Sequence, residues 1–452
     1  MTDGQQTAQL ANFVAECGYD QIPEPVRHAA RRALVDHIGV TVAGSADEAS
    51  KRARMAIAET ESGGFATVAG TRMRVAAPFA AFLNAFAAHV LDLDDVYNPP
   101  GTTVHGSCSV WPAILAVSET ADEPVDGRAA LATFALGFET ETRVAHAAGQ
   151  SHYDLGWHVT GTSAHVGAAA AAAKAMGLDR DGLEYAIAAG ATQAAGLRVM
   201  AGSDLKSMHP GKAAMDGVLS ATLAGQGLTA GRRALEGSFG YLAVMSTDPA
   251  PEKIGAGLGE TWNLTSNGHK LYPSGSLTHP MIDAVIALMT EHDIAPADVD
   301  GIALRVSVPA SRFTDIVSPT TGMEAKFSLR HCAAAAVTFR WMGTEQLVDE
   351  VLTRPDVVDL RDRVKLTADP ALGKQDADVE ITLTTGASVS AQVRGNRGTP
   401  AAPLSDEDLE TKFRSLVEPI LGVQRATELL AACWGVDELE DVSTVLALTV
   451  PE

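Results

Sequence analysis

The sequence contains few cysteines, and they form no recognisable motif. There are four in 452 residues, and no two of them make a CxxC pair. Disulfide frameworks and cysteine-based zinc sites need paired or closely spaced cysteines, so neither is expected here. The first ten residues also lack the basic and apolar regions of a signal peptide. Together these absences predict a cytoplasmic protein with reduced thiols at Cys17, Cys108, Cys332 and Cys433.

Positive charge is also scarce. The chain has 34 lysines and arginines against 56 aspartates and glutamates, which gives a net charge of −22. Such a charge repels nucleic acids and anionic membranes, so we expect neither as a partner. Apolar runs such as residues 76–91 are alanine-rich and contain polar side chains, and they do not predict a membrane span. A small anionic substrate would need a local group of cations.

Several motifs of cofactor and metal chemistry are missing. We find no GxGxxG after a strand, no Walker motif and no GxSxG elbow, so no nucleotide cofactor is expected. No HExxH supports a zinc site. Three side chains in one loop, Asp92, Asp95 and His105, leave a metal site as a minor alternative, and our expectation is that there is none.

The periodicity of the chain divides it into three segments. Residues 1–264 show helical spacing of apolar positions, as in the stretch from Pro25 to Gly44, where the proline would start a helix and the glycine would end it. Residues 265–401 include alternating segments that predict strands at 299–311 and 376–393, the second with a Thr-Gly turn. Residues 402–452 are helical again, and Ser405 and Asp408 resemble a capping box.

This division predicts a mainly α protein. We expect a large all-helical domain built from both chain ends, 1–264 and 402–452, with an α+β lid domain, 265–401, inserted between them.

Four polar clusters interrupt the apolar chain, at 89–106, 156–165, 203–217 and 267–280. Each combines histidine or lysine with glycine, serine, threonine or proline close to a helix start, where free N–H groups attract carboxylates. A lone histidine in such a place is more often a half-buried structural group than a catalyst. A local cationic patch would come from Lys206, His209, Lys212, His269 and Lys270.

The order of six motifs resembles the MmgE/PrpD family of 2-methylcitrate dehydratases, cis-aconitate decarboxylases and iminodisuccinate epimerases. The motifs are "HVLDLDDV", "VHGSCSVWPAILAVSE", "GWHVTGTSAHVGAAAAAAKAMGLD", "KSMHPGKAAMDGVLSATLAGQGLT", "KLYPSGSLTHPMIDAVIAL" and "EAKFSLRHCAAAAV". The resemblance implies the two-domain architecture described above, a homodimer and no cofactor.

The resemblance also implies an active site. The family's catalytic positions fall on Asp92, His105, His158, Lys206 and Lys270. We expect the substrate to contact a second set, Asp95, Val96, His209, Tyr272 and His331. The histidines would act as acid and base, the lysines would hold carboxylates, and Asp92 would orient an imidazole.

Two positions depart from the family pattern. Val96 replaces a threonine of decarboxylase-like members, and His331 stands where the family has a tyrosine. These departures count against decarboxylation of cis-aconitate. We expect a cofactor-independent lyase that acts alpha to a carboxylate of a small di- or tricarboxylic acid and dehydrates a 2-methylcitrate-like hydroxy acid. Decarboxylation of cis-aconitate and epimerisation of an iminodisuccinate-type acid are alternatives on the same scaffold. A non-catalytic anion-binding protein is the alternative of another class.

Overall fold

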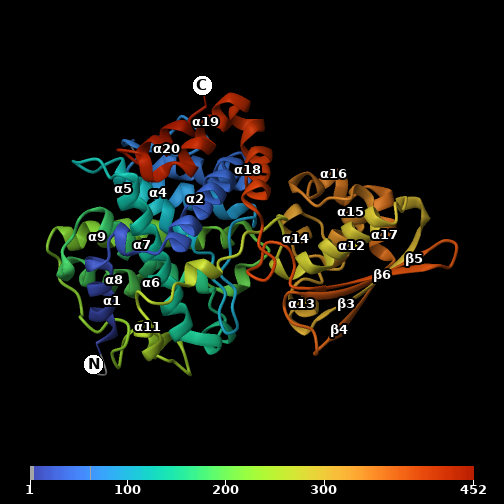
Figure 1. Cartoon of the computed structure of the whole chain (residues 1–452), viewed down its shortest axis with the longest axis horizontal. Helices are drawn as coiled ribbons and strands as arrows, with labels where there is room; N and C mark the ends of the chain where they lie inside the picture. The colour runs from blue at the N-terminus through green and yellow to red at the C-terminus, as the bar shows by residue number, and fades with distance from the viewer. Residues whose placement is uncertain (1–4, 62, 452) are drawn as a thin grey trace.

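The computed structural model describes residues 5–61 and 63–451, and its fold is mainly α, as predicted. Two parts lie side by side, and both chain ends belong to the helical one (Figure 1). Its hydrophobic core takes side chains from Leu10 to Leu264 and again from Leu409 to Leu446. A second core takes side chains from Tyr272 to Ile381. The domain boundaries at 264/265 and 401/402 stay a prediction; residues 1–4, 62 and 452 lie outside the described residues.

The helical part is a bundle with one short hairpin. Its elements are α1 (Gln6–Glu16), α2 (Glu24–Ser45), α3 (Glu48–Thr60), β1 (Ala66–Thr67), β2 (Arg74–Val75), α4 (Ala77–Val90), α5 (Ser107–Ser118), α6 (Gly127–Asp154), α7 (Ser163–Ala175), α8 (Arg180–Gln193), α9 (Met208–Gly225), α10 (Tyr241–Met245) and α11 (Glu252–Gly255). The C-terminal return adds α18 (Asp406–Leu421), α19 (Val423–Trp434) and α20 (Ser443–Leu448).

Small residues let these helices approach closely. A Cβ atom on Gly44 would lie 1.9 Å from the carbonyl oxygen of Ala87, so only glycine fits where α2 crosses α4. Gly217 has the same role where α9 meets Ala168 of α7. Gly44 therefore does not end the first predicted helix, which continues to Ser45. Its absence of a side chain serves packing between helices instead.

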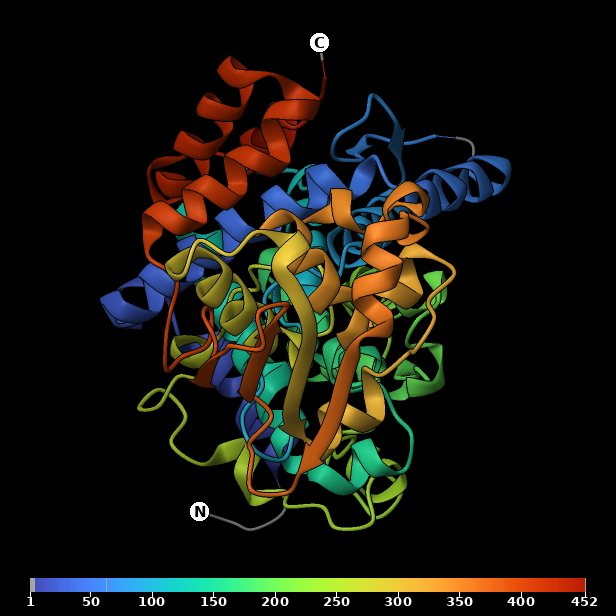
Figure 2. The same ribbon diagram turned by 90° about the vertical axis from the view of Figure 1, so that its right-hand side faces the viewer.

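The inserted part places helices on a four-stranded sheet. Its elements are α12 (His279–Glu291), β3 (Val299–Ser307), α13 (Val308–Phe313), α14 (Gly322–Ala325), α15 (Leu329–Phe339), α16 (Asp349–Leu352), α17 (Pro355–Asp362), β4 (Val364–Asp369), β5 (Asp376–Leu383) and β6 (Ser388–Arg394). The strand order is β4-β3-β5-β6. In Figure 2 this part lies in front of the helical part, beside the C-terminal helices.

Only β3 and β4 of this sheet run parallel, with Leu304 opposite Leu366, and the other pairs are antiparallel. Buried and exposed residues alternate along β3 and β5, as in a sheet with one face on a core. The buried face is covered by α12, α15 and α17, whose apolar side chains share the second core.

Two details correct the predicted strands. The first strand ends at Ser307 rather than at residue 311, because the Ser307 hydroxyl accepts a hydrogen bond from the N–H of Ala310 and caps α13. Strand β4 was not predicted. The second predicted segment forms a hairpin of β5 and β6, and its predicted Thr-Gly turn lies at 384–387. The capping box of Ser405 and Asp408 is confirmed at the start of α18.

One buried lysine ties the returning C-terminal helix to three other segments. The ammonium of Lys412 in α18 donates to Asp36 Oδ1 at 2.6 Å and to the carbonyl oxygens of Leu93 and Lys270, both at 2.7 Å. These partners belong to α2, to the loop after α4 and to the segment that enters the inserted part. Within the described chain, none of the helices has the length and apolar character needed to cross a membrane.

Candidate active site between the two parts

The loop that follows α4 begins with a strained residue. Asp92 has a φ of 54°, in the left-handed region that side-chain-bearing residues seldom adopt, and its N–H donates to the carbonyl of His89 at 2.9 Å. Such a conformation costs about 1–3 kcal/mol and persists when surrounding contacts hold it. In this position the helix end turns sharply, and the carboxylate of Asp92 faces the inserted part of the chain, where Lys270 lies.

Two lysines from distant segments share that carboxylate. Oδ1 of Asp92 lies 2.8 Å from Nζ of Lys206 and 3.0 Å from Nζ of Lys270. Lys270 also donates to the Asp92 carbonyl at 2.5 Å. Burial alone would raise the pKa of Asp92, but the two ammonium groups hold it well below its usual range. Burial lowers the pKa of Lys270 from its ordinary value.

A third lysine stands behind this group. Lys326, in the loop before α15, donates to the Val90 carbonyl at 2.7 Å. Burial lowers its pKa to about 8, while the charge of Asp92 opposes the shift. The three ammonium groups together exceed the single negative charge of Asp92. The site is therefore a local excess of positive charge in a protein whose net charge is −22.

One carboxylate orients two histidines. Oδ2 of Asp94 lies 2.8 Å from Nδ1 of His89 and 3.1 Å from Nδ1 of His105, and all three side chains are buried. The His105 Nδ1 also lies 2.9 Å from the carbonyl oxygen of Asp95. Carboxylate and carbonyl oxygens only accept, so both rings carry a proton on Nδ1. In neutral His105 this leaves Nε2 as the nitrogen with a free lone pair.

The orienting carboxylate is thus Asp94, and the expectation that Asp92 would orient an imidazole is wrong. Asp92 pairs with Lys206 and Lys270, and the imidazoles of His89 and His105 bond Asp94. The two histidine rings also pack on each other, with centroids 4.6 Å apart in an edge-to-face arrangement. His89, on α4, therefore supports His105 directly.

His158 reaches the same place from the loop between α6 and α7. Its Nδ1 lies 2.9 Å from Nδ1 of His209, on α9, and its backbone N–H donates to the Gly196 carbonyl at 2.9 Å. Burial, followed by the charge of Lys206, holds the pKa of His158 well below its ordinary value. Burial likewise lowers the pKa of His209 to about 4. Both rings are therefore neutral at pH 7.

All five residues predicted to be catalytic line one cavity of about 680 Å³. They come from four separate polar clusters of the sequence, and the cavity walls belong to both parts of the chain. Further walls are formed by Thr103, Tyr153, Arg198, Ser276, Phe313 and Phe327.

The residues predicted to contact substrate lie elsewhere. Asp95 is fully buried and accepts hydrogen bonds from Ser107 and Asn267, and burial raises its pKa to about 7. Tyr272 donates to Asp283 at 2.6 Å within the second core. Val96 lines a neighbouring hollow.

His331 and His209 complete this predicted set. The Nε2 of His331 bonds the Gln346 carbonyl at 2.9 Å, and the ring is fully buried inside the inserted part. It does not line the cavity, so its difference from the family tyrosine does not change the cavity wall. His209 contacts His158 but is not itself part of that wall.

Sequence reasoning missed three residues near the cavity. Arg198 and Ser276 line the cavity. Lys326 donates a hydrogen bond to the carbonyl of Val90, the last residue of α4. Lys326 and Ser276 stand inside quoted motifs but were not singled out. Arg198 stands between two polar clusters, and only its positive charge in an acidic protein could have indicated it.

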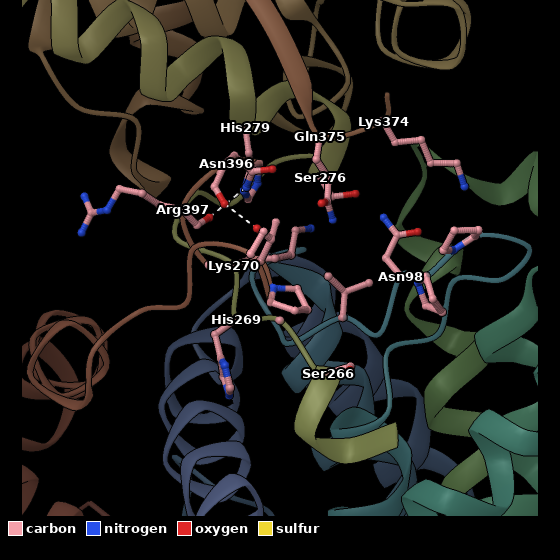
Figure 3. A pocket seen from close by; sticks show the side chains of 18 residues that line it. Asn98, Ser266, His269, Lys270, Ser276, His279, Lys374, Gln375, Asn396 and Arg397 are labelled. Carbon is pink, nitrogen blue, oxygen red and sulfur yellow. Dashed lines mark hydrogen bonds between the residues drawn. The ribbon is translucent and has the colours of Figure 1, made fainter. Parts of the chain in front are cut away.

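A smaller hollow of about 330 Å³ adjoins the cavity, and Lys270 and Ser276 line both. Figure 3 shows this hollow: Lys374 and Asn98 lie on one side of it, while His269 points away from the other labelled side chains. Val96 forms part of its wall and pairs with Gly268 through two backbone hydrogen bonds of 2.8 and 3.0 Å. This bridge fixes the start of the segment that carries Lys270.

His89, Asp94 and His105 are the group of described residues whose ligand atoms lie close enough to hold a metal ion, within 4.8 Å of one another. The 2.8 Å and 3.1 Å separations are those of hydrogen bonds. Two ligands of a tetrahedral zinc ion at its usual bond lengths would lie about 3.4 Å apart. The geometry therefore fits a hydrogen-bonded triad better than a zinc site, and it is not the combination of Asp92, Asp95 and His105.

These features define a class of protein: a mainly α enzyme that gathers histidines and lysines in a cavity between a helical part and an inserted α+β part. The chain belongs to the MmgE/PrpD family. Residues 8–254 match the MmgE/PrpD N-terminal domain, and residues 272–436 match the MmgE/PrpD C-terminal domain.

Sequence matches to curated relatives cover nearly the whole chain. A cis-aconitate decarboxylase-like protein of Aspergillus oryzae is 26% identical over 99% of this chain and 97% of its own length. The cis-aconitate decarboxylases of mouse and human are each 26% identical over 98% of this chain, and the matches cover 93% and 94% of their lengths.

Proposed function

We propose that this enzyme is a cofactor-independent lyase that forms a carbanion-like centre next to a carboxylate of a small di- or tricarboxylic acid. The observation that carries the proposal is the meeting of His105 and His158 with Lys206 and Lys270 in one cavity. Charge that develops on a substrate carboxylate needs preorganised cations, and the proton needs a positioned acid or base.

Decarboxylation of cis-aconitate or a similar unsaturated tricarboxylate is the first candidate. Relatives that match over more than 90% of their length are named cis-aconitate decarboxylase, and the departures at Val96 and His331 do not lie in the wall of the cavity. The bond between carbon and the departing carboxylate breaks, CO₂ leaves, and the electron pair spreads toward a carboxylate held by Lys206 and Lys270. A protonated imidazole then delivers a proton to carbon and regains one from water.

His105 is the better candidate for this proton transfer. Its Nδ1–H is fixed by Asp94 and the Asp95 carbonyl, so Nε2 is the nitrogen that exchanges a proton. Asp92 keeps the two lysines together and charged until the substrate carboxylate arrives.

Dehydration of a 2-methylcitrate-like hydroxy acid is the second candidate, and the pair of histidines favours it. One neutral imidazole removes the proton next to the carboxylate, the electrons form the alkene, and the hydroxyl leaves as water with a proton from the other ring. His158 is the candidate for the base because its lowered pKa keeps the ring unprotonated. The substrate binds in the same cavity in either case.

The test is NMR in D₂O with cis-aconitate, 2-methylcitrate and iminodisuccinate as separate substrates, before and after dialysis against a chelator. Loss of CO₂ identifies a decarboxylase, alkene formation a dehydratase, and deuterium exchange with inversion an epimerase. We expect the same rate after dialysis. No turnover and no exchange with any acid would favour a non-catalytic anion-binding protein and overturn the proposal.

We also propose that the enzyme is a homodimer. Several large apolar side chains stand exposed beside α8 and α9, above all Phe239, which is 95% exposed. The same face holds a hollow of about 940 Å³, lined in part by Leu223, Leu228 and Val244. A projecting aromatic ring next to an apolar hollow suits a two-fold interface, in which each copy fills the hollow of the other.

A further inference from the structure

Arg198 lies where the two parts of the chain face each other across the cavity. Its guanidinium carbon is 4.2 Å from the ring centre of Tyr153 in α6 and 5.0 Å from that of Phe313 in α13. One side chain therefore contacts both walls. Such stacking on two aromatic faces holds the guanidinium plane in place without using its N–H groups.

The backbone of Arg198 is tied to that of His158. The N–H of Arg198 donates to the Gly156 carbonyl at 2.8 Å, and the N–H of His158 donates to the Gly196 carbonyl at 2.9 Å. The two segments thus form a short antiparallel ribbon, and both side chains line the same cavity. The position of Arg198 relative to the reacting groups is fixed by local structure.

The guanidinium has donors to spare. Among its five N–H groups, one on Nη1 donates to the Tyr153 carbonyl at 2.9 Å. Within residues 5–61 and 63–451, no ion pair joins Arg198 to a carboxylate. Arg143 shows the usual arrangement in this chain, with Glu139 at 3.0 Å. An arginine without an acidic partner, in a cavity of a protein with a charge of −22, is suited to an anionic ligand.

We infer that Arg198 is a specificity-determining residue that binds a second carboxylate of the substrate, remote from the reacting carbon. The inference rests on the proposed function, because Lys206 and Lys270 are taken to hold the first carboxylate. A guanidinium binds a carboxylate through two parallel hydrogen bonds, which a single remote anion can satisfy. The site selects dicarboxylates and tricarboxylates over monocarboxylates of the same chain length.

The test measures binding rather than turnover. Glutarate and butyrate are suitable probes, since they share an unreactive aliphatic chain with a carboxylate at one end and differ by the carboxylate at the other. Their dissociation constants are measured by NMR titration or calorimetry for the wild type, Arg198→Gln and Arg198→Lys. Arg312→Gln is the matched control. The guanidinium carbon of Arg312 also lies near the ring centre of Phe313, at 5.3 Å, but Arg312 does not line the 680 Å³ cavity.

We expect Arg198→Gln to weaken glutarate binding about tenfold or more, as is typical for the loss of a charged hydrogen bond, and to change butyrate binding less than twofold. Arg198→Lys should fall between the wild type and Arg198→Gln, and Arg312→Gln should match the wild type. Equal weakening of both acids, or of neither, in a variant with a normal melting curve would overturn the inference. Lack of turnover with every acid would overturn the proposed reaction and leave this binding result standing.

Discussion

The Nδ1 atom of His105 lies 3.1 Å from Oδ2 of Asp94, and the same oxygen accepts a hydrogen bond from His89. This relationship gives the loop after α4 its chemical order. Asp92 forms ion pairs with Lys206 and Lys270. Asp94 fixes the tautomer of His105. The carboxylate of Asp95 is buried away from the cavity, and only its backbone carbonyl oxygen contacts the site, through Nδ1 of His105.

The two cavity histidines should both be needed for turnover. We expect His105→Ala and His158→Ala each to lower turnover by about 10²-fold or more, because a positioned acid or base typically contributes that much. Steady-state kinetics with thermal melts separate chemistry from folding. His28→Ala, at a surface ion pair with Asp406, is the control and should leave the rate unchanged. Near-normal turnover in both cavity variants would remove the proposed mechanism.

Asp94→Asn should lower turnover with little effect on substrate affinity. An asparagine can present its amide N–H to the imidazole and so favour the wrong tautomer of His105, and we expect a loss on the order of 10²-fold in kcat. The pH profile of kcat should shift with it, which a purely structural role would not cause. His89→Gln keeps a donor toward Asp94 and should retain most of the rate. A larger loss in His89→Gln than in Asp94→Asn would contradict this assignment.

Asp92→Asn should destabilise the fold at pH 7. The change leaves the buried ammonium of Lys270 and the half-buried ammonium of Lys206 without their carboxylate. Breaking a buried ion pair typically costs about 3–5 kcal/mol. The double variant Asp92→Asn/Lys206→Met should recover part of this loss, because one unpaired charge is removed. Urea unfolding at pH 7 measures both. The idea fails if the double variant is less stable than the single one.

Asp95→Asn should change the pH dependence of stability. The pKa of Asp95 is raised from near 4 in the unfolded chain to about 7 in the fold. Its favourable contribution is therefore complete below about pH 4 and is lost as the pH rises through 7. The variant should gain stability relative to the wild type across that window, by a few kcal/mol, since one pKa unit is about 1.4 kcal/mol.

Urea unfolding between pH 4 and pH 8 tests this prediction. Asp122→Asn, at an exposed position in the loop before α6, is the control and should follow the wild type at each pH. A stability difference between Asp95→Asn and the wild type that stays constant with pH would show that the carboxyl group does not titrate in this range.

Phe239→Asp should produce monomers. A charge in place of an aromatic ring that is 95% exposed cannot enter an apolar hollow on a second copy. Light scattering at micromolar concentration should give twice the monomer mass for the wild type and the monomer mass for the variant. Phe65→Asp, at another exposed phenylalanine far along the chain from this face, should remain dimeric. A monomeric wild type would contradict the proposal.

The fold was largely predictable because its signals are local. The start of α2 at Pro25, the alternation along β3 and the capping box of Ser405 depend on a few neighbouring residues. Strand β4 was missed because its partner, β3, is distant in the sequence: Ile302 pairs with Val364 in parallel. No local sequence pattern identifies a strand by so distant a partner. Gly44 was misread because its contact, Ala87, belongs to another helix.

The site was predictable by position more than by role. The motifs identified the five cavity residues, but the sequence could not say which aspartate faces which cation, since that depends on the left-handed backbone at Asp92. Tyr272 and His331 stand within the motifs, but both side chains are buried inside the inserted part and do not line the cavity. Arg198 belongs to no motif, and only the stacking of two distant aromatic rings reveals it.

Lys412, which supports two segments of the cavity, is synthesised after all the residues that line it. Its ammonium holds the backbone of Lys270 and of Leu93, the residue next to Asp92. On the ribosome, the residues that line the cavity, from Asp92 to Phe327, are synthesised before α18. A nascent chain stalled shortly before residue 412 would carry all the reactive groups without the support that holds two of them in register. Such a chain should bind and turn over substrate poorly until α18 packs against these two backbone segments.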